Sequence, residues 1–532
     1  KAPEHASRPI ISMRSLLLFL LCVAPQSSES YKFLGFSPQW AVSHVNYLGK
    51  IADALVDAGH EVVVLAPRVD PTMNGAGTKK ARVIQIPENE FSARWNNARI
   101  RANDLYWNGS ILELISEGSE MFESITLTIN ATIHYPGLIE QLRAENFDAA
   151  YTEDPAGFGI FDMVGIHKTV YAMSFTSLEC SYAITQSPST PSYVPSIFFA
   201  PWGDRMTFWQ RIANTFASFA WGFVVASRID WLQPIFKEDL WELVMNNSLV
   251  LLNSEPLLDF PRPTVHRAID IGGIVMSSNS EPLDEYWTEV MSRRNRTVIL
   301  SFGTFIKAST MPEVYKETIR KALAKFDDVT FIWKYESPEH NVSRGIDNIV
   351  EATWIPQVAL LNDPRLTVFI THGGQGSTLE AAYAGIPMLM LPTQGDQYRN
   401  AAMIKRAGLG EIVRLGDLEG GDRLKKSIQN ILDNEKYAVN ARRIAAMLRD
   451  RPFSAKEKVV RNMEFLAEYG PLRMLDHEGR NLNFIKYYLI DVILFIGLIT
   501  VIVLGLIGVC CVASCRCSFN RVRRRYNLLK QE

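Results

Sequence analysis

The residues with the clearest chemical pattern lie between Trp354 and Gln397. A strand-like run over residues 366–370 leads into Thr-His-Gly-Gly-Gln-Gly-Ser, and a helical pattern follows from about Ser377. Helix N-termini bind phosphate through free N–H groups and the helix dipole, and glycines let the backbone approach the anion. The segment therefore predicts a phosphate-binding turn, with the candidate residues His372, Gly373, Gly374, Gly376 and Ser377.

Side chains around this turn could bind the other parts of a nucleotide sugar. Trp354 offers a flat ring on which a base could stack. Glu380 could accept hydrogen bonds from ribose hydroxyls, as the acidic residue of dinucleotide sites does. Asp396 and Gln397 follow the next predicted strand and could hydrogen-bond sugar hydroxyls. A base stacker, a phosphate-binding helix, a ribose acid and a sugar-binding pair in one segment predict a nucleotide-sugar site.

Two α/β halves must position these residues. In the first half, a loop through His44 joins a strand-like run to a helical pattern and a second strand, which is a βαβ unit. Such units imply parallel sheets covered on both faces. We expect an α/β fold with two Rossmann-like lobes and a cleft between them. The predicted strands are 31–36, 62–66 and 147–151 in the first half and 297–300, 329–333, 366–370 and 387–391 in the second.

The whole pattern resembles the UDP-glycosyltransferases, the GT-B-fold family that includes the membrane-bound UDP-glucuronosyltransferases of animals. The similarity covers nearly all of the body and the C-terminal apolar segment, and it includes Asp450-Arg451-Pro452. It implies that Trp354 stacks on uracil, that Gln357 and Glu380 hold ribose, that His372 and Ser377 grip the diphosphate, and that Asp396 and Gln397 hold the sugar. The donor site implied in this way also includes Ser301, Gly303, Thr304 and Ile355.

The resemblance also implies a catalytic pair in the first half. His44 matches the general base that takes the acceptor proton, and an ordinary histidine, with a pKa near 6.5, suits that task. The acidic residue that orients this base follows a later strand. Glu153 is the first choice by spacing and Asp154 the second. The predicted reaction is one direct displacement with inversion.

One position departs from the family pattern. Gly376 stands where many members have Asn, so a donor-side amide contact is missing. The sequence does not choose between glucose and glucuronic acid as the donor sugar. It has no Asp-x-Asp motif for a metal, and we expect a UDP-sugar donor with no metal or other cofactor. Two other interpretations stay open: a catalytically silent UDP-sugar-binding membrane protein, or an epimerase or hydrolase on the same fold.

Both ends of the sequence indicate the secretory pathway. After Met13, one Arg and a short apolar run over residues 16–24 have the pattern of a cleaved signal peptide. Residues 492–513 form an uncharged apolar run that is long enough to cross a hydrocarbon core of ~30 Å. The arginines after it predict a cytosolic tail by the positive-inside rule. We expect a single-pass type I protein with a luminal body, and the resemblance implies the endoplasmic reticulum membrane.

The predicted organisation has six segments. They are 1–30 (upstream residues and signal peptide), 31–270 (acceptor-binding lobe), 271–440 (UDP-sugar-binding lobe), 441–486 (helices returning to the first lobe, and linker), 487–513 (membrane helix) and 514–532 (basic tail). Luminal exposure would make Asn-x-Ser/Thr triplets glycosylation sites. We expect use at Asn108, Asn130, Asn246 and Asn341, whereas a predicted strand starts two residues after Asn295.

Composition excludes several other classes of protein. The 532 residues are 47% hydrophobic and 21% charged, which rules out a disordered chain. A net charge of −2 disfavours nucleic-acid binding. Of the six cysteines, only Cys180 lies in the main body, so no disulfide framework is expected there. Expected partners are a UDP-sugar, a small lipophilic acceptor with a hydroxyl, and the bilayer; a homo-oligomer is a possible assembly.

Residues 190–240 are rich in proline and aromatic residues. They predict either helices that pack on the first lobe or a region that faces the membrane or lines the acceptor site. A second membrane span is disfavoured, because Arg211, Asn214 and Arg228 interrupt or flank the apolar stretch.

Overall fold

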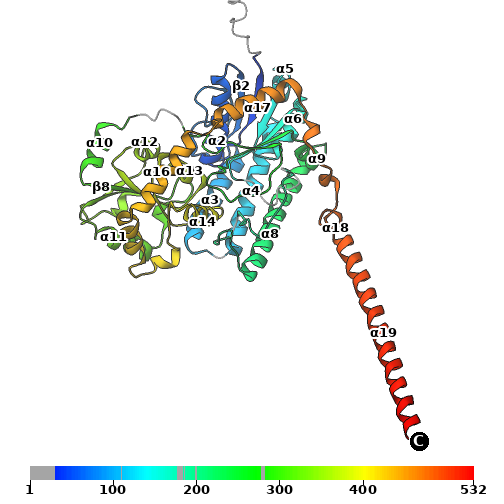
Figure 1. The fold of residues 1–532 in the computed structure, drawn as a ribbon. Coiled ribbons are helices and arrows are strands. Elements are labelled where there is room, and N and C mark those ends of the chain that lie inside the picture. Colours follow the sequence, from blue (N-terminus) through cyan, green and yellow to red (C-terminus); the bar gives the residue numbers. More distant parts are fainter. Residues whose placement is uncertain are drawn as a thin grey trace, which may run out of the picture. The chain divides into compact units, whose positions relative to one another are not determined.

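A computed structural model describes residues 30–109, 111–176, 184, 186–197, 200–276 and 282–531 (Figure 1). The chain forms two compact units, Lys1–Arg473 and Met474–Glu532. The predicted signal-peptide residues 13–29, which include Cys22, lie outside the described residues, as does Cys180.

The first lobe of the larger unit is built on a seven-stranded parallel sheet in the order β3-β2-β1-β4-β5-β6-β7. Strands β4, β5 and β6 are buried along their whole length, and β1 and β2 are buried after their first residue, as expected where helices cover both faces. The strands are β1 (Lys32–Phe36), β2 (Glu61–Pro67), β3 (Arg82–Ile86), β4 (Ala149–Thr152), β5 (Thr169–Met173), β6 (Leu249–Leu252) and β7 (Ala268–Asp270).

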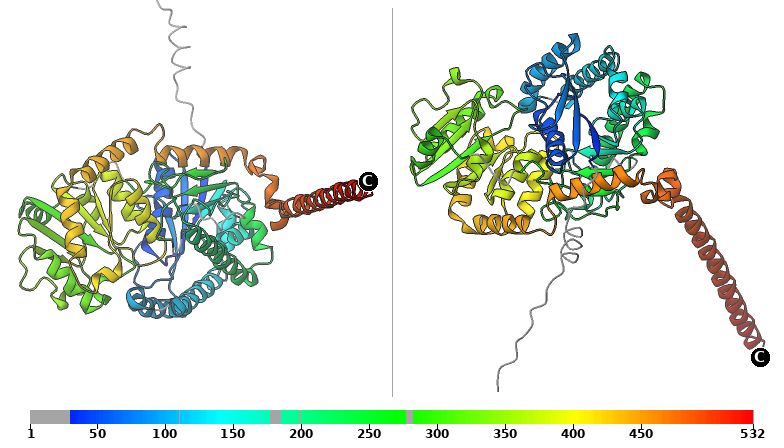
Figure 2. Two further views of the ribbon diagram at one scale, coloured as in Figure 1. Left: turned by 60° about the horizontal axis from the view of Figure 1, so that its bottom comes forward. Right: turned by 90° about the horizontal axis from the view of Figure 1, so that it is seen from above.

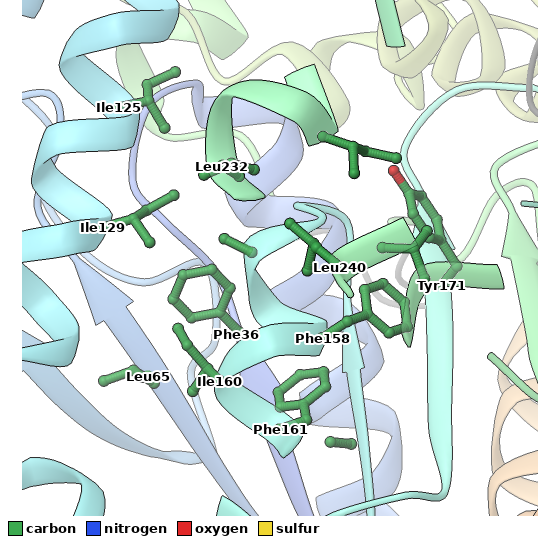
Figure 3. Close-up of a cluster of buried hydrophobic side chains, with 14 of the residues drawn as sticks. Phe36, Leu65, Ile125, Ile129, Phe158, Ile160, Phe161, Tyr171, Leu232 and Leu240 are labelled. Atoms are coloured by element: carbon green, nitrogen blue, oxygen red, sulfur yellow. The ribbon is translucent and has the colours of Figure 1, made fainter. Parts of the chain in front are cut away.

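Helices pack around this sheet and close its core. Phe36 and Leu65 of the strands contact a buried apolar cluster that includes Phe158 of α6, Ile125 of α4 and Leu232 of α8 (Figure 3). The helices between the strands are α2 (Val42–Asp57), α3 (Glu90–Asn108), α4 (Ile111–Ile133), α5 (Leu138–Ala144), α6 (Ala156–Val164), α8 (Phe208–Leu232) and α9 (Leu240–Met245).

The second lobe has a six-stranded parallel sheet in the order β10-β9-β8-β11-β12-β13. Its strands are β8 (Arg296–Ser301), β9 (Val329–Lys334), β10 (Ile349–Ala352), β11 (Leu366–Thr371), β12 (Met388–Met390) and β13 (Gly410–Ile412). Its helices are α10 (Glu285–Ser292), α11 (Glu313–Leu323), α12 (Gln357–Leu361), α13 (Gln375–Ala384), α14 (Gln397–Arg406), α15 (Arg423–Asp433) and α16 (Glu435–Arg449). Figure 2 shows the two sheets as separate, helix-covered layers. The predicted α/β class with two parallel-sheet lobes is confirmed.

The chain returns from the second lobe to the first after α16. Helix α17 (Ala455–Tyr469) packs against α2 and β4, and its Glu464 lies 3.2 Å from Nε2 of the buried His60. Between α16 and α17, Arg451 donates to Glu255 of the first lobe at 2.7 Å. The hydroxyl of Tyr383 on α13 donates to the same carboxylate at 3.0 Å. These contacts tie the two lobes together around Glu255.

Two sequence-based boundaries are corrected by the structure. His44 was expected in a loop but lies in the first turn of α2. The second correction concerns α13, which begins at Gln375, so that Gly376 and Ser377 form its first turn instead of preceding it. The first turn of α2 includes the polar Ser43 and His44, and that of α13 consists of Gln375, Gly376 and Ser377, so the apolar spacing used for the prediction becomes clear only after these residues.

The smaller unit contains α18 (Phe484–Tyr487) and α19 (Ile490–Leu529), a continuous helix of 40 residues. Within the described part of the chain, α19 is the one helix long and apolar enough to cross a membrane. At ~1.5 Å per residue its length is about twice the thickness of a hydrocarbon core. The predicted basic tail continues the helix to Leu529, since it contains neither glycine nor proline to end it.

Candidate active site

His44, Glu153 and Ser174 meet at the carboxyl edge of the first sheet. Nδ1 of His44 lies 2.7 Å from Glu153 Oε2 and 2.9 Å from Ser174 Oγ. Ser174 donates to Glu153 Oε1 from both its hydroxyl, at 2.6 Å, and its backbone N–H, at 2.7 Å. Because the carboxylate only accepts, Nδ1 of His44 carries the proton and Nε2 keeps a lone pair.

Three neighbouring elements bring these side chains together. Glu153 follows β4 and Ser174 follows β5, while His44 stands on the helix that follows β1. The carboxyl ends of parallel strands share one edge, which is where such folds gather functional groups. Aromatic rings fix the imidazole further: the ring centroid of Trp40 is 4.0 Å from that of His44, and the centroid of Phe175 is 5.0 Å away.

The second acidic candidate, Asp154, points elsewhere. Its Oδ1 accepts from the backbone N–H of Ala156 at 2.9 Å, at the start of α6. Its Oδ2 accepts from the Arg228 guanidinium of α8 at 3.3 Å. The carboxylate that contacts His44 is therefore that of Glu153, and Asp154 holds the start of α6 and the inner side of α8. Ser174 was missed in the sequence, although a polar residue directly after a strand next to β4 is a usable signal.

The donor turn forms between β11 and α13 as predicted. Gly373 has φ +90°, a conformation that favours glycine, and Gly374 is the N-cap residue of α13. The His372 ring sits between two glycines, because a Cβ atom on either Gly303 or Gly374 would lie 2.8 Å from it. Burial lowers the pKa of His372 to about 4, while a hydrogen bond with the Ser301 backbone acts in the opposite direction. The imidazole is therefore neutral at pH 7.

The two proposed ribose ligands contact each other. Gln357 Nε2 donates to Glu380 Oε2 at 2.6 Å and to Ser377 Oγ at 3.1 Å. Burial raises the pKa of Glu380 to about 7, and the hydrogen bond from Gln357 offsets part of that rise. Trp354 lies between β10 and α12 with 67% of its side chain exposed, so its ring is open to a ligand, whereas Ile355 beside it is buried.

Asp396 and Gln397 begin α14. Asp396 Oδ2 accepts from Asn400 at 2.7 Å, and Asn400 also donates to the Gly373 carbonyl at 2.9 Å. Burial raises the pKa of Asp396 to about 6, while Asn400 and the charge of His44 lower it. A protonated His44 in the first lobe would therefore favour the ionised form of Asp396 in the second. Gln397 Oε1 accepts from Thr393 N at 2.9 Å, which holds the loop before α14.

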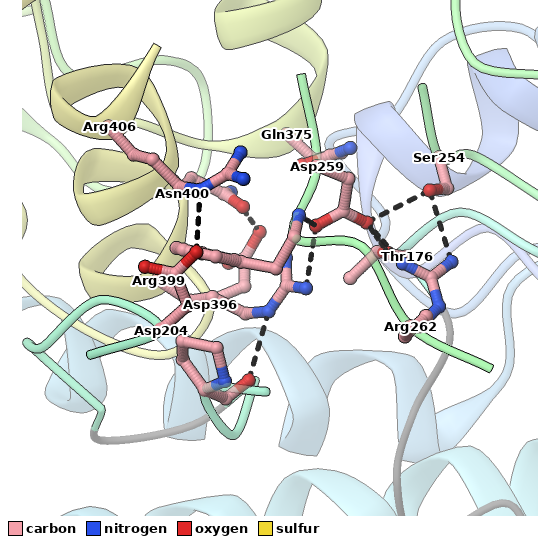
Figure 4. A network of polar contacts seen from close by, with 12 residues as sticks. Thr176, Asp204, Ser254, Asp259, Arg262, Gln375, Asp396, Arg399, Asn400 and Arg406 are labelled. Carbon is pink, nitrogen blue, oxygen red and sulfur yellow. Dashed lines mark hydrogen bonds and ion pairs between the residues drawn. The ribbon is translucent and has the colours of Figure 1, made fainter. Parts of the chain in front are cut away.

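A buried ionic network fixes α14 against the first lobe (Figure 4). Arg399 Nη2 lies 2.6 Å from Asp259 Oδ1, and Arg399 Nε donates to the Pro195 carbonyl at 3.1 Å. Arg262 holds the other oxygen of Asp259 at 2.6 Å. These two guanidinium groups hold the pKa of Asp259 well below its usual range against the opposing effect of burial. The network positions the helix that begins with Asp396.

The remaining donor-site candidates lie at the carboxyl end of β8 or in the first turn of α13. Ser301 is buried and accepts from Gly303 N at 3.3 Å; Gly303 has φ +78°, and Thr304 is exposed. A Cβ atom on Gly376 would contact nothing within 4 Å, so the space next to it is open. The residues that sequence reasoning missed here are Asn400 and Arg399, which follow Asp396 at helical spacing.

The predicted glycosylation sites differ in accessibility. Asn108, Asn130 and Asn341 are exposed. Asn246 is half-buried, and its Oδ1 accepts from Arg473 at 2.8 Å. Asn295 is exposed but directly precedes β8.

Solved structures share this architecture. A UDP-glucosyltransferase from Polygonum tinctorium, described as capable of glucosylating indoxyl, matches with a TM-score of 0.58 at 14% identity over 84% of this chain and 100% of that one. Phytolacca americana UGT2, complexed with UDP-2fluoro-glucose and pterostilbene, matches with a TM-score of 0.55 at 15% identity over 83% and 100%. The two lobes define a glycosyltransferase fold of the GT-B class.

The sequence comparisons identify the family. The family described as UDP-glucoronosyl and UDP-glucosyl transferase matches residues 36–525, and the chain belongs to it. It is 28% identical to ugt-48 of Caenorhabditis elegans, whose name places it among the UDP-glucuronosyltransferases, over 92% of this chain and 96% of that protein. It is 27% identical to UDP-glucuronosyltransferase 1-2 of Rattus norvegicus over 94% and 95%. The protein is thus a UDP-glycosyltransferase, as its signature predicts.

Proposed function

We propose that the protein transfers a hexose, glucose or glucuronic acid, from a UDP-sugar to the hydroxyl of a small lipophilic acceptor. The observation that carries this proposal is the contact of 2.7 Å between His44 Nδ1 and Glu153 Oε2. Because this contact occupies Nδ1 of His44, Nε2 of the imidazole remains available as a base. Asp396, the proposed sugar ligand, stands directly before α14 of the donor lobe. A proton acceptor and a sugar-binding carboxylate then act on the same reacting centre.

The proposed reaction is a single displacement. His44 Nε2 takes the proton of the acceptor hydroxyl while its oxygen forms a bond to the anomeric carbon. The bond between that carbon and the UDP oxygen breaks on the opposite side, and UDP leaves with the electron pair. The configuration at the anomeric carbon is therefore inverted. The carboxylate of Glu153 stabilises the imidazolium that forms and keeps its Nδ1 proton in place.

The second lobe would stabilise the leaving group. The N–H groups at the start of α13 and the Ser377 hydroxyl meet the charge that develops on the diphosphate. A neutral His372 can donate one hydrogen bond there without competing for a proton. Gln357 and Glu380, already paired, are placed to share the two ribose hydroxyls, and Trp354 can cover the base.

Membrane anchoring through α19 is part of the proposal. Its apolar segment would span the bilayer once, with the arginine-rich end in the cytosol and the body in the lumen of the endoplasmic reticulum. Treating sealed microsomes with protease tests this orientation. The body should be protected and the C-terminal residues cleaved. Sensitivity of the electrophoretic mobility to a glycosidase would show that asparagines of the body are luminal.

A donor panel tests the function. Microsomes containing the chain are supplied, with and without EDTA, with a phenolic acceptor and one of four donors: UDP-glucose, UDP-glucuronate, UDP-galactose or UDP-N-acetylglucosamine. We expect conjugate, detected by mass, from one of the first two donors. Loss of conjugate caused by EDTA would overturn metal independence. Consumption of donor without any acceptor would indicate a hydrolase, and UDP binding without turnover would indicate a silent binding protein.

A further inference from the structure

Helix α8 lies beside α4 on the first lobe (Figure 1). It carries a stripe of exposed aromatic side chains. Trp209, Phe216 and Phe223 are 74%, 71% and 75% exposed, and Phe208 is 58% exposed. The seven-residue spacing of the first three places them on one side of the helix, because seven residues make nearly two turns. Single exposed apolar residues are common, but a continuous stripe of large aromatic rings marks an interaction surface.

The orientation of α8 is fixed by its opposite side. Asn214 is buried, and its amide donates to the carbonyls of Pro191 and Val194 at 2.8 and 2.9 Å. Ile229 and Leu232 are fully buried in the core of the lobe. A rotation of α8 that buried the aromatic stripe would break the hydrogen bonds of Asn214 and expose Ile229 and Leu232. The buried side of the helix therefore keeps the stripe facing outward.

The charges on α8 suit a phospholipid surface. Helix α8 carries Arg211, Arg228 and one acidic residue, Asp230, which stands beyond the aromatic stripe and accepts from Trp241 Nε1 at 2.9 Å. Arg228 is turned inward to Asp154, whereas Arg211 is exposed at the end of the stripe, as is Arg205 just before the helix. Aromatic rings favour the interfacial region of a bilayer, and exposed guanidinium groups bind lipid phosphates.

We infer that the α8 aromatic face, formed by Phe208, Trp209, Phe216 and Phe223, lies in the interfacial region of a phospholipid bilayer. The helix lies on the membrane and does not cross it, because among the described helices only α19 meets the requirements for a span. The inference rests on the anchor proposed above, but not on the sugar transfer.

The anchor is also the reason to prefer a bilayer to a second copy of the chain. The segment between the end of the larger unit and α19 runs from Met474 to Leu489, and it can extend by at most roughly 55 Å. A body on so short a tether is held at a high effective concentration next to lipid, so even a modest affinity of the aromatic face for the interface is enough for docking.

Photolabelling of the full chain tests the inference. The protein is reconstituted in phosphatidylcholine vesicles that contain a photoactivatable phosphatidylcholine with its reactive group near the glycerol. After irradiation and trypsin digestion, the peptide 212–228 is released by cleavage at Arg211 and Arg228. We expect lipid adducts on this peptide and on peptides of α19. The variant Trp209→Gln/Phe216→Gln/Phe223→Gln should lose labelling of 212–228 by about tenfold and keep that of α19.

A matched variant controls for the loss of exposed apolar surface in general. Val314→Gln/Val439→Gln/Phe465→Gln removes three exposed side chains on α11, α16 and α17 and should leave labelling of 212–228 unchanged. Labelling of α19 without labelling of 212–228 in the unmodified chain would overturn the docking and leave the anchor intact. Labelling of neither would overturn both. Crosslinks between the 212–228 peptides of two copies would assign the face to self-association and overturn the bilayer inference.

Discussion

Nδ1 of His44 lies 2.7 Å from Oε2 of Glu153, although the two residues are 109 positions apart in the sequence. The contact joins the first turn of α2 to the loop after β4. It fixes the tautomer in which the imidazole can act as a base through Nε2. Neither residue could do this alone, because a free imidazole exchanges its proton between both nitrogens.

Replacing Glu153 and Asp154 separately should distinguish their roles. Glu153→Gln removes the acceptor charge at His44, and we expect kcat to fall by about 10²–10³-fold, within the range of acid–base catalysis. Asp154→Asn keeps an oxygen that can accept from Ala156 N, so kcat should stay close to that of the unmodified enzyme. The rate of conjugate formation at saturating UDP-sugar gives kcat for both variants. The reverse order of the two effects would assign the orienting role to Asp154.

Glu380 should make stability depend on pH. Its pKa is raised to about 7 in the folded chain, whereas an unfolded glutamate has an ordinary value near 4.3. The folded state therefore binds the proton more tightly, and its stabilising effect is lost as the pH rises from about 4 through about 7. Glu380→Gln mimics the protonated form, so its Tm without ligand should be close to that of the unmodified protein at pH 4 and exceed it by a growing margin up to pH 8. Equal Tm differences at both pH values would contradict the raised pKa.

The glycines of the donor site should differ sharply in their tolerance of side chains. Gly376→Asn places its Cβ in open space, and we expect an unchanged Tm with an altered KM for the UDP-sugar. Gly303→Ala combines φ +78° with a contact of 2.8 Å to His372 and should destabilise the fold by about 1–2 kcal/mol. The Tm from thermal unfolding and the KM for the UDP-sugar are measured for both variants. An intact KM in Gly376→Asn would show that this position does not face the donor.

Breaking the buried ion pair at α14 should cost much more than breaking a surface pair. Asp259→Asn leaves the buried Arg399 guanidinium without its carboxylate, while Arg262 keeps Asp270 at 3.6 Å, and we expect a loss of about 3–5 kcal/mol in the free energy of unfolding. The donor KM should also rise, because α14 begins with Asp396. Glu289→Gln, which breaks an exposed pair with Arg293, is the control and should cost less than about 0.5 kcal/mol. Similar losses in both variants would refute the positioning role of the network.

Much of the donor site could be predicted because its residues are close in sequence. The strand, the Gly-rich turn and the helix after it follow one another directly, so local patterns place His372, Ser377 and Glu380 without knowledge of the tertiary structure. The two lobes could be predicted for the same reason, since each βαβ unit is a local pattern.

The contacts that cross between elements could not be predicted. Ser174 reaches Glu153 because β5 lies next to β4, and no periodicity in the sequence reports that neighbour. The choice between Glu153 and Asp154 depends on which carboxylate the strand end turns toward His44, since the other is used to begin α6. The pairing of Arg399 with Asp259, 140 positions apart, likewise depends on how the lobes meet.

The most direct test of the catalytic proposal is the effect of His44→Gln on turnover and on UDP binding, measured on one preparation. The substitution removes the base but touches none of the proposed UDP ligands on the second lobe. We predict a fall in kcat of about 10²–10⁴-fold with the Kd for UDP, from calorimetry, unchanged. Unchanged turnover in a variant that still binds UDP would contradict His44 as the general base.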